Sequence, residues 1–322
     1  MDSNSKNNVP NTVYHYTSPS GLLGIVDNEE NSKNAKLWFT RWDSLNDKNE
    51  RYDIQEVLKE YKKSKGDSIP KEFQDAIQKL IDTDVDEWEL PQIRFMDNAG
   101  NTIISEIDSK NVYICSFSVD KDSLPMWNYY SKSSHYEGYA LEINFERWKE
   151  HVEKLIGYAL DIRRVIYRKD DKIAELDAIV LKCKKNLEIV QENPYGIRGT
   201  EDIKRDLSLS IAKLQFCFKD EHFSHENEVR VIFTILKNRN ISNEKTAKDG
   251  DASNKVTIKY RQGYGYTIPY VEIPVPKEAI TSVRVGPLFD KELAKKNVNV
   301  KEILESRGCS CKVHTSEVPI RY

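Results

Sequence analysis

Two carboxylates and a guanidinium alternate in the segment HENEVRV at 225–231. On a β-strand this spacing places Glu226, Glu228 and Arg230 on one face, with Val229, Val231 and Phe233 on the other. A carboxylate that a neighbouring arginine holds ionised can stabilise developing positive charge, such as the oxocarbenium formed when the bond between ribose and nicotinamide breaks. The same side chains could instead form a structural cross-strand ion pair. The sequence leaves both interpretations open.

A second group of polar side chains lies in YHYTS at 14–18. His15 and Thr17 share one face of an expected strand, so an imidazole and a hydroxyl could together bind a ribose, with Tyr16 between them. The alternative is a histidine at a sheet edge whose hydrogen bonds are satisfied within the protein.

Aromatic and hydroxyl side chains follow in CSFS at 115–118 and MWNYYS at 126–131. We expect Ser118 to contact a bound nucleotide, and Trp127 or Tyr130 to stack on nicotinamide. Core packing is the default for Trp127, and a short helix lets only one or two of its aromatics line a site. Cys115, inside a β-branched strand, is expected to be inert packing.

The polar segment 41–50 supplies a further carboxylate. Asn46 and Asp47 form a natural turn or helix cap, and Asn46 is a candidate ligand of the nucleotide. Glu50 would lie in the first turn of a helix, where the macrodipole favours a carboxylate. Asp47 and Glu50 together with Glu228 would also suit a metal-dependent nuclease.

Cysteine spacing indicates neither a disulfide framework nor a metal site. The five cysteines are scattered and odd in number, so we expect them to be reduced. Cys309 and Cys311 have one residue between them, where zinc sites usually have two to four, and only His314 follows. We therefore expect no metal cofactor.

Composition limits the classes of partner. The chain has 322 residues, 39% of them hydrophobic, which is enough for a substantial core. Its charged residues balance to a net charge of −3, so any nucleic-acid contact must be local. The sequence has neither an apolar run long enough for a membrane span nor a secretory start, and we expect a cytoplasmic protein without membrane contact.

The order of the expected elements predicts an α+β fold with a single mixed, mostly antiparallel sheet and flanking helices. The clearest strands are expected at 111–118, 138–145, 158–167 and 227–236, with further strands at both ends of the chain. Apolar residues at helical spacing over 171–218 predict an inserted helical hairpin. We expect a disordered segment over 1–12, followed by one domain over 13–322.

The combined order of these motifs resembles a known family. HYTS, LWFT with LND and a following Glu, CSFS, MWNYYS, GYALEI and ENEVRVIF occur in that order in the bacterial domain-of-unknown-function family 2971. The resemblance covers 13–287 and is weakest over the hairpin at 171–215. Each motif alone is unspecific, whereas the order is specific.

This resemblance implies an ADP-ribosyltransferase-like fold and a setting in bacterial defence. His15, Tyr130 and Glu228 match the expected histidine, aromatic and late-strand glutamate, and Glu226-Asn227-Glu228 resembles the Glu-x-Glu turn of arginine-directed members. The spacing of Tyr129 and Tyr130 departs from that of the toxin-type transferases.

Three functional hypotheses follow. The leading one is an NAD-consuming enzyme, an ADP-ribosyltransferase or NAD glycohydrolase, with NAD as substrate and a protein or nucleic-acid acceptor. Its expected catalytic residues are Glu228, Glu226 and His15, and its expected nucleotide ligands are Tyr16, Thr17, Asn46, Ser118, Trp127, Tyr130 and Arg230. The alternatives are a non-catalytic nucleotide- or partner-binding module of a defence system, and the metal-dependent nuclease. All three require the four polar segments to meet in one aromatic-rich cleft.

Overall fold

The fold is known from a computed structural model of the chain. It describes residues 10–26, 32–45, 50–88, 90–96, 102–107, 111–130, 137–156, 160–193, 198–235, 237–240, 256–263, 265–287 and 298–319. The expected disorder over 1–12 falls mostly outside these residues, as do Asn46 and Asp47.

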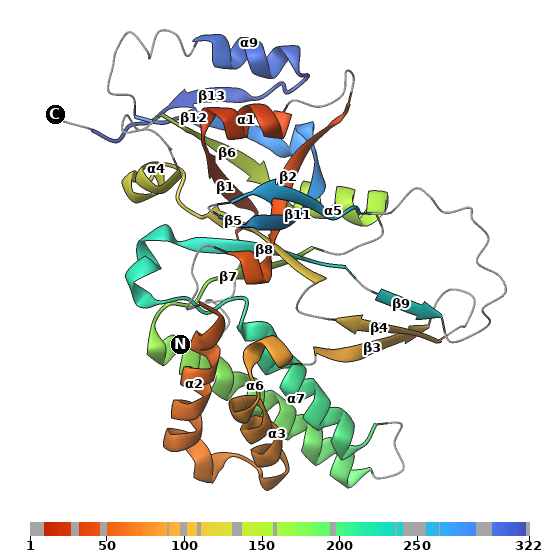
Figure 1. Cartoon of the computed structure of the whole chain (residues 1–322). Helices are drawn as coiled ribbons and strands as arrows, with labels where there is room; N and C mark the ends of the chain where they lie inside the picture. The colour runs from red at the N-terminus through yellow and green to blue at the C-terminus, as the bar shows by residue number, and fades with distance from the viewer. Residues whose placement is uncertain are drawn as a thin grey trace.

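Ten of the described strands form one large sheet (Figure 1). Eight of them follow the spatial order β10 (Lys259–Gln262), β11 (Thr267–Pro276), β2 (Asn34–Arg41), β5 (Val112–Ser118), β1 (Thr12–Thr17), β6 (Tyr139–Asn144), β12 (Ile280–Val285) and β13 (Lys312–Thr315). Two more strands lie off this path: β8 (Glu228–Thr234) pairs with β5, and β7 (Asp161–Arg164) pairs with β8. Among these strands only β12 and β13 pair in parallel. The predicted α+β fold with a mixed, mostly antiparallel sheet is confirmed.

Strand β5 is the branch point of this sheet. One edge of β5 pairs with β8 over its whole length, from Val112↔Thr234 to Ser118↔Glu228. The other edge is shared, because β2 pairs only at Tyr113 and Ile114 and β1 pairs only at Ser118. Residues 115–117 on that edge thus have no described strand beside them, and β1 and β2 diverge there.

One face of the sheet, here called the core face, carries Val13, Cys115, Phe117, Leu141 and Val229. These side chains are buried against the helices α1 (Pro19–Val26), α5 (Phe145–Ile156) and α9 (Val298–Ser306). Strand alternation turns the intervening residues to the opposite face. That opposite face, here called the polar face, carries Ser116, Ser118, Glu228 and Arg230.

One helix at one end and a group of helices at the other cover the polar face, and polar side chains occupy its middle. At one end Tyr16 and Ala140 pack against Met126 and Trp127 of α4 (Leu124–Tyr130). At the other end Ile114 and Ile232 pack against a helical lobe. The lobe contains α2 (Glu50–Lys65), α3 (Lys71–Asp82), α6 (Lys169–Glu192) and α7 (Thr200–Leu214), which gather below the sheet in Figure 1.

Helices α6 and α7 form the hairpin that the apolar spacing predicted. Leu176, Val180 and Cys183 of α6 are buried in the same cluster as Leu207 and Ile211 of α7, at intervals of three to four residues. A stripe of this kind buries one side of each helix, so its role is packing.

Two features were not predicted from the sequence, and a third, β7, was predicted with the wrong length. Helix α5 follows β6 without a break, and its buried Trp148 contacts both Phe39 and Phe117. A second sheet of β3 (Leu90–Met96), β4 (Thr102–Ile107) and β9 (Lys237–Asn240) lies beside the helical lobe in Figure 1. Strand β7 spans four residues where ten were expected. No described helix has the length and apolar content to cross a membrane.

The stability of this core can be tested at Phe117. Its side chain is buried on the core face and contacts Trp148 and His15. Phe117→Ala should lower the free energy of unfolding by roughly 3–5 kcal/mol, because it removes buried apolar contacts and leaves a cavity. Urea unfolding measures the change. Leu181→Ala, at an exposed position of α6, should change the free energy of unfolding by less than about 0.5 kcal/mol. Equal changes in the two variants would contradict the assignment of Phe117 to the core.

Candidate functional site

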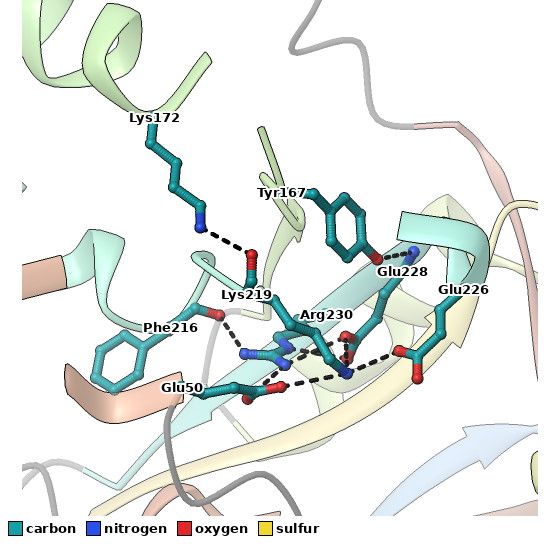
Figure 2. A network of polar contacts seen from close by, with 8 residues as sticks. All are labelled: Glu50, Tyr167, Lys172, Phe216, Lys219, Glu226, Glu228 and Arg230. Carbon is teal, nitrogen blue, oxygen red and sulfur yellow. Dashed lines mark hydrogen bonds and ion pairs between the residues drawn. The ribbon is translucent and has the colours of Figure 1, made fainter. Parts of the chain in front are cut away.

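A buried network of charged side chains occupies the middle of the polar face (Figure 2). The Lys219 ammonium lies at its centre. Its Nζ is 2.7 Å from Glu226 Oε2, 3.2 Å from Glu228 Oε2 and 3.2 Å from Glu50 Oε1. One cation therefore contacts three carboxylates, two of them one residue apart in the chain and the third at the start of α2.

Arg230 is the second cation of the network, and its side chain is only 1% exposed. Its Nε donates to Glu228 Oε1 at 2.9 Å, and its Nη2 donates to Glu50 Oε2 at 2.8 Å. Its Nη1 donates to the Phe216 carbonyl at 3.1 Å. The guanidinium thus joins the sheet to the first residue of α2.

Local backbone structure explains how two glutamates separated by one residue reach the same ammonium. Glu226 ends a short 3₁₀ helix, and β8 begins only at Glu228. The prediction that Glu226 lies on the strand is therefore wrong, although Glu228 and Arg230 do share a face of β8. Between the glutamates, Asn227 adopts the left-handed conformation (φ 43°), which asparagine tolerates better than most residues. Its side-chain amide donates to Asp120 at 2.7 Å and fixes the turn.

An outer layer of contacts holds the network in place. The Lys172 ammonium, from α6, donates to the Lys219 carbonyl at 2.8 Å and also pairs with Asp53 of α2. The backbone N–H of Glu228 donates to the Tyr167 hydroxyl at 2.8 Å. The lobe and the sheet are therefore connected through polar contacts as well as apolar ones (Figure 2).

The charges within the network do not balance. Glu50, Glu226 and Glu228 outnumber Lys219 and Arg230 by one. Burial alone would raise the pKa of Glu228, but Arg230 and Lys219 outweigh it and lower that pKa to about 2. For Glu50 burial prevails over the same two cations, so its pKa is raised. Glu228 is thus held as a carboxylate, while Glu50 protonates more readily than an exposed glutamate.

Several of the expected nucleotide ligands are framework side chains beside this network. The Tyr16 hydroxyl donates to the Asp120 carbonyl and accepts from the Ser123 N–H, and Ser118 Oγ donates to the Glu226 carbonyl. Trp127 is buried, and its indole N–H donates to Asp122. In all three residues a polar group is therefore hydrogen-bonded within the protein. These hydrogen bonds position the turn that carries the glutamates.

Tyr130 differs from these residues because it is half-buried at the end of α4. Burial raises the pKa of its hydroxyl, and the nearby carboxylates Glu228 and Glu226 raise it further. The Ser116 hydroxyl, also half-buried, hydrogen-bonds Glu228. Tyr130 and Ser116 are therefore partly exposed polar groups next to Glu228, as is Tyr167, whose hydroxyl accepts from the Glu228 N–H.

His15 does not join this group. Strand alternation puts it on the core face, where its ring lies 5.4 Å from that of Phe117. Its Nδ1–H donates to the Ser116 carbonyl at 3.1 Å, across the opening where β1 leaves β5. Thr17 shares that face of β1, so the expectation that His15 and Thr17 meet the glutamates on one surface is not met. The imidazole instead satisfies a backbone carbonyl that has no strand partner.

The described residues give the nuclease hypothesis no geometric support. Glu50 is paired with Arg230 and Lys219, and Asp47 lies outside the described residues. Within the described part of the chain, no group of three or more His, Cys, Asp or Glu side chains is placed to hold a metal ion. All five cysteines are free, and burial raises the pKa of Cys115.

Lys219 is the central residue that sequence reasoning missed. It follows the hairpin in a segment without strand or helix periodicity, so no local pattern distinguishes it from a solvated lysine. The indirect signal was the surplus of acidic side chains at 226–228, which buried together would require a cation.

Comparison with known proteins gives one match. The model of a family described as a protein of unknown function (DUF2971) matches residues 126–231. This stretch runs from α4 to β8 and includes Tyr130, Lys219 and Glu228, and it also includes the hairpin, where the motifs resemble that family least. The match supports the resemblance to that family, whose description names no activity. No curated protein and no solved structure matches the chain.

The strained turn at Asn227 yields a stability prediction. Asn227→Ala should be less stable than Asn227→Gly by roughly 1 kcal/mol in urea unfolding, because alanine disfavours positive φ and glycine does not. Both variants lose the hydrogen bond to Asp120, so their difference isolates the backbone. Equal stability of the two would show that the left-handed turn is absent in solution.

His15 yields a pH prediction. Burial lowers its pKa below the usual value of 6.5, although the bond to the Ser116 carbonyl opposes this. The folded protein then binds fewer protons here than the unfolded chain, so the neutral imidazole stabilises the fold above pH 6.5 and this stabilisation is lost as the pH falls below that value. His15→Gln should therefore lose less stability than wild type between pH 7.5 and 5.

Urea unfolding at both pH values measures the effect. His314→Gln, the same substitution at an exposed position, should follow wild type. An unchanged pH dependence in His15→Gln would mean that the imidazole is not desolvated.

Proposed function

We propose that this protein cleaves NAD at the bond between nicotinamide and ribose, as an ADP-ribosyltransferase or an NAD glycohydrolase. Glu228 is the carboxylate that stabilises the cationic transition state. The electron pair of the broken bond leaves with nicotinamide, which becomes neutral, and water or an acceptor then bonds to the ribose carbon and releases a proton. A setting in bacterial defence rests on the family resemblance.

The excess carboxylate of the buried network is the observation that carries this proposal. Three carboxylates face two cations, and Glu228 is held ionised with a pKa of about 2. A carboxylate held ionised in a poorly solvated setting favours a neighbouring positive charge, and it is already oriented before the reaction begins.

The geometry also suggests which side chains would meet the substrate. Tyr130 and Ser116 are both half-buried. The Glu228 carboxylate raises the pKa of the Tyr130 hydroxyl, and Ser116 hydrogen-bonds Glu228. Tyr130 is thus the candidate to contact nicotinamide, and Ser116 is the candidate to contact ribose. His15 and Thr17, on the core face, are left out of this arrangement, and Arg230 acts by orienting Glu228.

A second candidate is a non-catalytic nucleotide- or partner-binding module. The observation in its favour is burial, because the Glu228 side chain is 5% exposed and both its oxygens contact Arg230 or Lys219. A network of this kind can serve only to join the sheet to the helical lobe. NAD binding without release of nicotinamide would favour this candidate.

Release of free nicotinamide from NAD by the purified protein tests the enzymatic proposal. Wild type should release it, and Glu228→Gln should reduce the rate by at least roughly 100-fold, because the amide cannot stabilise the cation. Activity is normalised to the folded fraction, measured by circular dichroism, since this substitution also leaves Arg230 and Lys219 underpaired.

Asp177→Asn is the matched control. It replaces a carboxylate that accepts a hydrogen bond from buried Tyr61 within the lobe, far along the chain from the glutamates. Its folded fraction should release nicotinamide at the wild-type rate. Undiminished release by folded Glu228→Gln would remove Glu228 from the chemistry, and no release by wild type would contradict the proposal itself.

A further inference from the structure

Exposed aromatic side chains gather at one border of the large sheet. Strand β10 is its edge strand and forms a hairpin with β11, which pairs in turn with β2. Tyr260 of β10 is 66% exposed, Tyr266 of the turn 53% and Trp38 of β2 42%. Strand alternation turns Tyr260 and Trp38 to opposite faces, so the rings surround the edge of the sheet. Among the described residues these are three of the five exposed Trp and Tyr side chains, so the exposure is concentrated here.

Cationic side chains lie beside Trp38 on its face of the sheet. Lys36, Lys259 and Arg261 share a face with Trp38, and Glu272 is the carboxylate among them. The ammonium groups of Lys36 and Lys259 both approach Glu272, at 3.7 and 2.8 Å. One carboxylate serves two lysines, and with Arg261 the border keeps a local excess of positive charge on a chain whose net charge is −3.

Arg261 and Trp38 are held in a fixed arrangement. The Arg261 guanidinium lies 5.8 Å from the centroid of the Trp38 ring. The centroid of the Tyr270 ring, on the same sheet face, lies 4.7 Å from that of Trp38. Nη2 of Arg261 donates to Thr40 Oγ1 at 2.9 Å, whereas its Nε is shielded and has no hydrogen-bond partner among the described residues. The arrangement of Arg261, Trp38 and Tyr270 is therefore pre-organised.

We propose that this β10 border, defined by Lys36, Trp38, Lys259, Tyr260, Arg261 and Tyr266, binds single-stranded nucleic acid. Unpaired bases stack on exposed aromatic rings, and neighbouring lysines and arginines contact the phosphates. Stacking of this kind is available to every base, so the binding tolerates many sequences. The inference goes beyond NAD cleavage and does not rest on it.

The pattern favours this occupant over two others. A duplex hides its base faces, so exposed rings would gain little from it. An acidic peptide would match the charge, but it offers no flat surface to three aromatic side chains. Both serve as competing outcomes of the test.

Fluorescence anisotropy with a labelled single strand of about 12 nucleotides of mixed sequence tests the proposal on the whole protein. We expect binding that weakens with salt and exceeds that of the matching duplex or of a poly-glutamate peptide. Trp38→Ala and Tyr260→Ala should each weaken it roughly 5- to 100-fold, and Lys36→Ala with Lys259→Ala should reduce its salt dependence.

Tyr52→Ala on α2 is the matched aromatic control, because Tyr52 is exposed to nearly the same extent as Trp38. Lys301→Ala on α9 is the matched control for the lysines. Both should bind like wild type, and circular dichroism checks that each variant is folded. The lysine variant keeps the test valid if Trp38→Ala unfolds. Tighter binding of the duplex or the peptide, no binding, or equal effects of border and control variants would each overturn the proposal.

Discussion

Two buried cations, Lys219 and Arg230, determine how this molecule is assembled. Removing a charge from water costs several kcal/mol unless other charges and hydrogen bonds replace the solvent. Here the replacements come from the start of α2, from the 3₁₀ helix at 221–226, from β8 and from the Phe216 carbonyl. None of these segments could bury its charge alone. Their mutual dependence joins the helical lobe to the sheet at one defined position, which apolar packing alone specifies less strictly.

The same constraint decides which functional roles the geometry allows. The network lies on the polar face, so the sheet itself separates it from residues whose side chains point to the core face, such as His15. Its surplus of one carboxylate gives the site a negative character although most of its charges are paired. Chemistry at this site would therefore act on a cationic centre, with Tyr130 and Ser116 among the neighbouring groups that solvent partly reaches.

Sequence reasoning predicted those features that are encoded locally. The β-branched run of β5, the alternation of Glu228 and Arg230 on β8, and the apolar stripe of the hairpin each follow from a period of two or of about 3.6 residues. It could not predict the left-handed Asn227, which takes Glu226 off the strand, or the divergence of β1 from β5, which turns His15 into a partner of a backbone carbonyl. Lys219 was missed because its role depends on glutamates supplied by tertiary structure.

The most direct measurement of the central claim is a double-mutant cycle between Lys219 and Glu228 in urea unfolding. If the network joins lobe and sheet, Lys219→Met and Glu228→Gln should each destabilise the fold by roughly 3–5 kcal/mol, since each leaves a buried partner uncompensated. The double variant should then lose about 1–3 kcal/mol less than the sum, because the two residues act on one another. Effects that add to within about 0.5 kcal/mol would show that the two charges are independent, and would contradict the account.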